Sequence, residues 1–492
     1  MMMNRREFAK GGLAALGFLA LDGLPVFAAP VGWKPKKKPN LVLGILSDTH
    51  LMVEWDGKSL YRSMTLDYIR NAFRLFKARG IDAFLHLGDA SHRGCMREWE
   101  FHRELFDEVF GKSGRPERII VVGNHELFGG DGHCRKVYGN QKSWDENAIC
   151  ADLPGHYERM WGEAYAEIMH REIKGYHFFF RDWNADEIKF ADFILSHAEL
   201  CGLKGKKPFF ILSHRRHHFG FCHALREYPN AVAFFGHWHQ SNADYKTIYY
   251  DSFGGFFPSI EVGACRFDGG NALDVGHESV LKEKFATSGE TGELKEQDWH
   301  SNKVPSRQAM VVNIYDDFVV FERHEVGQGG KLGPDWVLPL KWREKKDANG
   351  EPFKHPFSHD MLARRIGSPE FPPKAKLEIG KMADALNLTI PLADGNPKSR
   401  VFAYDVVAIG DNPAKKFFKS AYFEGVNLGI GHEPDGGITK VELPMAELPA
   451  GKNLTIAVRP ISSLGTKGKA IATKFQGVSH SAIQQKRKER NT

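Results

Sequence analysis

Five short motifs in the first half of the chain contain side chains of the types that bind metal ions. In chain order they are SDTH, GD, GNHE, SH and GHWH, at residues 47–50, 88–89, 123–126, 213–214 and 236–239. The candidate ligands in them are Asp48, His50, Asp89, Asn124, His214, His237 and His239. One tetrahedral zinc site needs about four ligands. Seven ligands, including a carboxylate that could bridge, therefore predict a site for two ions.

The ligand types also limit which metals are expected. Four of the seven candidates are imidazoles and none is a thiolate. Mixed nitrogen and oxygen ligands suit Mn, Fe or Zn better than an oxygen-only cage for Mg or Ca. A single HxH motif in a chain with 23 histidines would mean little. Five motifs in order predict a centre of two divalent or trivalent ions.

Each motif stands at the end of a short apolar run. These runs cover residues 41–46, 83–87, 119–122, 209–212 and 232–235, and helical patterns lie between them. Alternating strands and helices predict an α/β domain. Sites in open α/β sheets form at the carboxyl ends of the strands. We therefore expect the five motifs to meet at such an edge.

In this order, the motifs DxH, GD, GNHE, a strand-end His and GHxH resemble the calcineurin-like metallophosphoesterase superfamily. The resemblance covers roughly residues 40–265 and implies a four-layer α/β/β/α sandwich. It implies that Asp48, His50 and His239 hold one metal, that Asn124, His214 and His237 hold the other, and that Asp89 bridges them.

The resemblance also implies an activity, that of a metal-dependent phosphoric ester hydrolase acting on phosphate esters. Two nearby ions activate a bridging water and clamp the oxygens of an in-line displacement. We expect the hydroxide between the metals to attack phosphorus directly, without a covalent enzyme intermediate. His125 corresponds to the family residue that contacts the phosphate and helps to protonate the leaving group.

Two departures from family patterns limit which branches of the superfamily the chain resembles. Purple acid phosphatases have Gly at the position of His50 and Tyr at that of His92, so that branch is disfavoured. The stretch GDASHRG matches the GDxVDRG of protein phosphatases only in part. His92, Arg93 and Arg215 are candidate contacts to the substrate phosphate, while a surface ion pair or a solvated loop is the alternative for the arginines.

The first 28 residues resemble a twin-arginine signal peptide. Arg5 and Arg6 precede a short apolar stretch that ends in small residues. The stretch is too short for a permanent membrane span. We expect export by the twin-arginine translocation machinery to the periplasm or the exterior, followed by a basic linker over residues 29–39.

The remaining chain predicts two further units. The catalytic domain is expected over residues 40–340, with a long polar loop at 126–160 that could act as a lid. A linker is expected at 341–370. Seven short strand patterns within 371–478 predict an all-β, immunoglobulin-like sandwich resembling a fibronectin type III module. Residues 479–492 look like a basic tail.

Composition excludes several classes of protein. The 492 residues are 42% hydrophobic and 26% charged, which is typical of globular proteins and not of disordered, collagen-like or polytopic membrane chains. A net charge of +6 gives little support for nucleic acid binding. No CxxC pair is present, which argues against zinc-ribbon and thioredoxin-like readings. The alternatives left open are a phosphodiesterase or nuclease of the same superfamily and a non-catalytic binding scaffold.

Overall fold

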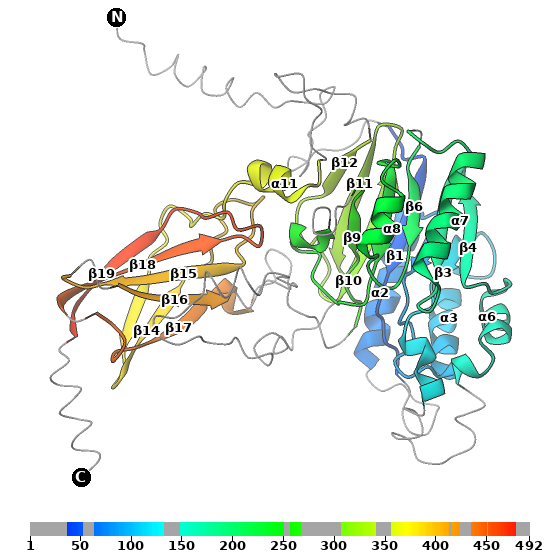
Figure 1. Cartoon of the computed structure of the whole chain (residues 1–492). Helices are drawn as coiled ribbons and strands as arrows, with labels where there is room; N and C mark the ends of the chain where they lie inside the picture. The colour runs from blue at the N-terminus through cyan, green and yellow to red at the C-terminus, as the bar shows by residue number, and fades with distance from the viewer. Residues whose placement is uncertain are drawn as a thin grey trace, which may run out of the picture.

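The computed structural model describes residues 37–52, 63–131, 148–205, 207–249, 256–266, 307–340, 356–412, 416–422, 434–449 and 451–478 (Figure 1). The predicted signal peptide, most of the predicted basic linker and the predicted tail lie outside these ranges. So does the first half of the predicted linker at 341–370. Within the described ranges, no helix is both long and apolar enough to cross a bilayer.

The α/β part contains two six-stranded sheets. The first has the order β12 (Trp336–Pro339), β11 (Phe318–Glu325), β10 (Gln308–Ile314), β1 (Leu41–Leu46), β2 (Ala83–His86) and β3 (Glu117–Ile120). The second has the order β4 (Ile168–Ile173), β5 (Tyr176–Arg181), β6 (Phe209–Leu212), β7 (Ala231–Phe235), β9 (Ser259–Glu261) and β8 (Ile248–Tyr249). Strands β1 to β3 are parallel to one another, as are β5, β6, β7 and β9.

Helices cover the outer face of each sheet. On the first sheet they are α2 (Ser63–Arg79), α3 (Met96–Phe110) and α6 (Leu153–Trp161), and on the second they are α7 (Glu187–Leu200) and α8 (Phe219–Ala224). Strand β1 shows the layering, because Leu43 and Ile45 face the core between the sheets while Val42 and Leu46 face the helices. This is the predicted four-layer α/β/β/α sandwich.

The five apolar runs are strands, as predicted from the sequence. The antiparallel pair β4 and β5 was not predicted, although Tyr176–Arg181 contains three consecutive phenylalanines. The predicted loop at 126–160 is partly wrong. It contains the 3₁₀ helices η1 (His125–Asp131) and η2 (Ile149–Asp152) and nearly all of α6, whose Tyr157 and Met160 lie in the core under the helices.

In the described residues, the C-terminal part contains seven antiparallel strands in two sheets, as an all-β module requires. One sheet contains β13 (Glu378–Lys381), β14 (Ala385–Ile390) and β17 (Thr439–Pro444). The other contains β16 (Lys416–Tyr422), β15 (Ala403–Ile409), β18 (Gly451–Ile461) and β19 (Ile471–Val478). The short helix η6 (Pro434–Gly437) precedes β17. The closer resemblance to fibronectin type III remains a prediction.

The segment predicted as a linker contains the helix α11 (His359–Ile366), which packs against the α/β part. Leu362 and Ile366, together with Phe357 before the helix, belong to the core between the two sheets. His359 Nε2 lies 2.8 Å from the carbonyl oxygen of Ile248. From the C-terminal module, the Ser463 hydroxyl donates to the buried carboxylate of Asp244, which stands before the 3₁₀ helix η3 (Tyr245–Thr247).

Candidate metal centre

The predicted ligands converge from strand ends of both sheets. They follow β1 (Asp48 and His50), β2 (Asp89), β3 (Asn124), β6 (His214) and β7 (His237 and His239). The carboxyl ends of these parallel strands lie along one edge of the sandwich, which is where sites form in open α/β sheets.

The backbone at these positions is strained. Outside glycine, positive φ occurs in the described residues at Lys174 and at five predicted ligands, which are Asp48 (52°), His50 (44°), Asp89 (53°), His237 (76°) and His239 (56°). Such a conformation costs about 1–3 kcal/mol in a non-glycine residue, and it persists where the surroundings demand it. Its concentration here marks the strand ends as a functional site.

Two motif glycines are required because the site leaves no room for a Cβ atom. A Cβ on Gly123 would overlap the carboxylate of Asp89, and one on Gly236 would overlap the side chains of Ser47 and Asp48. The missing side chains at these glycines therefore let the neighbouring carboxylates lie against the backbone.

The first ligand group contains Asp48, His50 and His239, whose ligand atoms all lie within 4.8 Å of one another. His239 Nε2 lies 3.1 Å from both Asp48 Oδ1 and His50 Nε2. Hydrogen bonds also orient the Asp48 carboxylate, which accepts from the Ser47 hydroxyl and from the backbone N–H of His237.

The second group contains Asp89, His214 and His237, again within 4.8 Å. Asp89 Oδ2 lies 3.0 Å from His214 Nε2 and 3.6 Å from His50 Nε2, so it stands between the two groups. His214 Nδ1 lies 2.8 Å from the carbonyl oxygen of Leu87, which can only accept a hydrogen bond. This contact places the hydrogen on Nδ1 and leaves Nε2 for a cation.

The side-chain oxygen of Asn124 is in a state that a bound metal ion would explain. Its Oδ1 is buried and has no hydrogen-bond partner among the described atoms. An amide oxygen left in this state is costly, since nearly all buried polar atoms in proteins are paired. A cation beside Asn124 would satisfy this oxygen, as its predicted role as a ligand requires.

The electrostatics of the centre favour positive charge. Burial alone would raise the pKa of the Asp48 carboxyl, but the imidazoles of His239 and His214 hold that pKa well below its ordinary value. Burial lowers the pKa of His214, yet Asp89 and Asp48 outweigh burial and raise it to about 9. Without a metal, the two carboxylates therefore hold a proton on His214, in a place where a cation could replace it.

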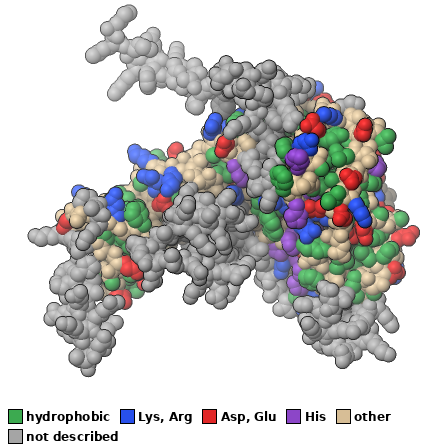
Figure 2. Space-filling view, viewed as in Figure 1, with side chains coloured by type: hydrophobic (Ala, Val, Ile, Leu, Met, Phe, Trp, Pro, Cys, Tyr) green, Lys and Arg blue, Asp and Glu red, His purple; other side chains and the backbone are tan. Residues whose placement is uncertain are grey.

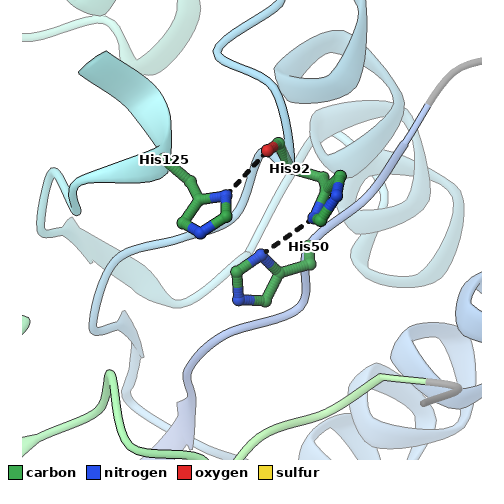
Figure 3. A group of neighbouring side chains, drawn as sticks. All are labelled: His50, His92 and His125. Carbon is green, nitrogen blue, oxygen red and sulfur yellow. Dashed lines mark hydrogen bonds between the residues drawn. The ribbon is translucent and has the colours of Figure 1, made fainter. Parts of the chain in front are cut away.

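His125 borders the first group (Figure 3). Its backbone N–H donates to Asp89 Oδ1 at 2.9 Å, and its Nδ1 donates to the carbonyl oxygen of His92 at 2.7 Å. Its Nε2 lies 3.9 Å from Asp89 Oδ2, and its ring meets that of His50 edge to face at 4.4 Å. The nitrogen free for substrate chemistry is therefore Nε2, on the side of the candidate ligands.

Two buried glutamates that the sequence analysis did not assign hold the loop after β2. Glu126 accepts from the backbone N–H groups of Asp89, Ser91 and Gly123 at 2.7–2.9 Å. Glu98 accepts from the Ser91 hydroxyl and from the backbone N–H groups of His92 and Arg93. Glu126 is the last residue of the GNHE motif, and Glu98 lies in the first turn of α3, directly after the loop.

Arg215 stands at the rim, next to the second ligand group. Its guanidinium lies 4.8 Å from the ring of Trp183, and that ring lies 4.9 Å from the ring of His237. Trp183 was not predicted as a site residue, because it follows strand β5, which was not predicted either. Arg93 follows His92 in the same loop, where its backbone N–H donates to Glu98. Its contact with the substrate stays a prediction.

Solved structures similar to this chain share little sequence with it. A dimetal phosphatase from Danio rerio is 13% identical, with 62% of this chain and 100% of that chain covered and a TM-score of 0.35. The purple acid phosphatase PPD1 from yellow lupin seeds is 14% identical, with 64% and 57% covered and a TM-score of 0.37. An archaeal phosphodiesterase is 14% identical, with 46% and 85% covered and a TM-score of 0.23.

A match at the level of the family is more specific. No curated protein matches the chain significantly. The family model described as calcineurin-like phosphoesterase matches residues 41–241, a range that contains all five motifs. Residues 41–241 are therefore similar to the calcineurin-like phosphoesterase family, and this match supports the enzyme class of the metal-dependent phosphoric ester hydrolases.

Proposed function

We propose that this protein is an exported phosphoesterase that hydrolyses phosphate esters at a centre of two metal ions. The observation that carries the proposal is the position of Asp89, whose Oδ2 lies between the two ligand groups. The first ion would be held by Asp48, His50 and His239, and the second by Asn124, His214 and His237. Asp89 would bridge them. Bound there, ions such as Mn, Fe or Zn would activate a water between them and clamp the phosphoryl oxygens.

The protein's own groups would do the rest of the chemistry. Asp48 and Asp89 stay ionised and bring the negative charge that balances the cations. His125, with its hydrogen on Nδ1 held by the His92 carbonyl, would turn a protonated Nε2 toward the leaving oxygen. Burial lowers the pKa of His125, so the anionic substrate would have to favour its protonated form.

The rim of the centre offers groups for binding the substrate. The guanidinium of Arg215 lies against Trp183, beside the second ligand group, where it could contact a phosphate. On the face seen in Figure 2, acidic and basic side chains are interspersed over the α/β part. The described side chains on that face form no large positive area for a nucleic acid backbone, so we favour a small phosphate ester over a nuclease substrate.

Export is proposed from the sequence alone. Arg5, Arg6 and the short apolar stretch after them resemble a twin-arginine signal, which carries folded proteins. Folding before export would let the metals load before the chain leaves the cell.

The experiment is a substrate screen on the metal-free protein without residues 1–28. The protein is supplied with Mn, Fe or Zn and offered p-nitrophenyl phosphate, its bis ester and a panel of phosphorylated metabolites. We expect turnover of at least one ester with metal and its loss on chelation. A protein that binds two metals but hydrolyses none of these esters would contradict the proposal and favour a binding scaffold.

A further inference from the structure

His92 connects a proposed metal ligand with the proposed acid (Figure 3). Its Nδ1 lies 3.3 Å from His50 Nδ1, and the two rings meet edge to face with their centroids 5.4 Å apart. Its backbone carbonyl oxygen lies 2.7 Å from His125 Nδ1. The side chain of His92 therefore contacts His50, while its backbone contacts His125.

The geometry of His50 determines how this contact is made. Its Nε2 lies 3.1 Å from His239 Nε2 and 3.6 Å from Asp89 Oδ2, so Nε2 faces the ligand group. A neutral imidazole that gives the Nε2 lone pair to a cation carries its hydrogen on Nδ1. His50 Nδ1–H then donates to His92 Nδ1, and His92 carries its own hydrogen on Nε2.

This hydrogen bond matters because His50 is closed off from water. The side chain of His50 is 1% exposed, so its Nδ1–H must find its acceptor within the protein. The acceptor is held firmly, since the backbone N–H of His92 donates to Glu98 at 3.2 Å and that of Arg93 at 3.0 Å. Ser91, just before them, is bound by both Glu98 and Glu126.

We propose that His92 is a positioning residue that orients His50 for one of the two cations, an inference that rests on the dinuclear centre proposed above. The role differs from the substrate contact expected from the sequence. It predicts an effect chiefly on one ion, because His50, whose Nδ1 contacts His92 Nδ1, belongs to the first ligand group. Loss of such an outer partner typically weakens metal affinity 10- to 100-fold.

The test is a metal titration of the metal-free protein by calorimetry, with Mn or Zn as the only ligand. His92→Leu removes the acceptor at similar volume, and His92→Asn keeps an oxygen near the place of Nδ1. We expect His92→Leu to bind one of the two equivalents 10- to 100-fold more weakly and the other as the wild type does. His92→Asn should recover most of the loss. Turnover at saturating metal should fall far less than in His125→Ala, because the His92 carbonyl remains in place.

A matched control comes from another histidine pair. His177 Nδ1 lies 3.0 Å from His170 Nε2 on the β4–β5 hairpin, away from the candidate ligands. His177→Leu breaks this pair and should leave both metal affinities as in the wild type.

Three results would overturn the inference. Unchanged metal affinities in His92→Leu, with a raised KM for the ester, would make His92 a substrate contact. A third equivalent in the wild type that is lost in His92→Leu would make it a ligand of its own. Equal metal affinities in His92→Asn and His92→Leu would show that acceptance of the hydrogen bond is irrelevant. If His92→Leu fails to fold, His92→Ala takes its place in this comparison. Because metal binding is measured without substrate, a wild type that binds two ions but hydrolyses nothing would contradict only the proposed function.

Discussion

Asp89 and His214 come from different sheets, yet their side chains meet with Oδ2 and Nε2 3.0 Å apart. Asp89 follows β2 of the first sheet and His214 follows β6 of the second. The contact therefore exists only when the apolar faces of the two sheets are packed together, with residues such as Leu85 and Phe210 in the shared core. Folding of the sandwich and formation of the centre are thus one event.

Replacing His125 should separate chemistry from metal binding. His125→Asn removes the imidazole whose Nε2 faces the centre, while the backbone N–H that donates to Asp89 Oδ1 remains. We expect close to two metals per chain and a kcat lowered by roughly 10²- to 10⁴-fold if His125 is a general acid. The loss should be smaller for p-nitrophenyl phosphate, because p-nitrophenolate needs no proton to leave. Kinetics on good and poor leaving groups, with metal analysis, would check this. Loss of a metal would make His125 a ligand instead.

The sequence predicted the strand ends well because the chemistry there is local. Each motif places a glycine or small residue beside a ligand, and at Gly123 and Gly236 a larger residue would overlap a neighbouring carboxylate. Trp183 was not predicted, because it reaches the centre only through the packing of a strand from another part of the chain. Glu98 was not predicted although it lies only five to seven residues after the loop residues it binds, because its inward direction depends on where α3 begins. The helix α11 was not predicted, because its segment is polar and only Leu362 and Ile366 in it face the core.

Shortening the chain should show that α11 supports the α/β part. A chain that ends at residue 345 loses Phe357, Leu362 and Ile366 from the core between the sheets, whereas one that ends at 367 keeps them. Removing a large buried apolar side chain costs about 2–5 kcal/mol. We therefore expect the chain ending at 345 to be insoluble or to have a Tm lower by about 5 °C or more. Equal Tm values would mean that α11 contributes nothing to the stability of the α/β part.

Glu322 lies away from the metal site, and its ion pairs should make the stability of the protein depend on pH. Burial alone would raise the pKa of Glu322, but His324, Lys331 and Arg79 outweigh it and lower the pKa to about 2. A carboxyl with a lowered pKa in the folded protein stabilises it above the unfolded pKa, about 4.5, and loses this effect as the pH falls toward 2. The melting temperature of Glu322→Gln should therefore fall less than that of the wild type between pH 5 and 3.5. Both proteins are melted metal-free, so that metal release does not contribute, and parallel curves would disprove the assignment.

The route of export can be tested at Arg5 and Arg6. Replacing both with Lys keeps the charge but should abolish transport by a bacterial twin-arginine translocase. Fractionation followed by immunoblotting should find the double-Lys chain unprocessed in the cytoplasm and the wild type shortened near Ala28 outside it. Normal processing and export of the double-Lys chain would exclude this route.

The central claim is that Asp89 joins two metal ions, and a metal count on an Asp89 variant tests it most directly. Asp89→Asn keeps the shape of the side chain and removes the negative charge between the two ligand groups. Asp192→Asn, on the exposed surface of α7, makes the same chemical change away from the centre and serves as the control. Metal analysis of the reconstituted proteins should give close to two ions for the wild type and for Asp192→Asn. Asp89→Asn should hold fewer ions and lose most of its turnover, while two tightly held ions in that variant would contradict the account.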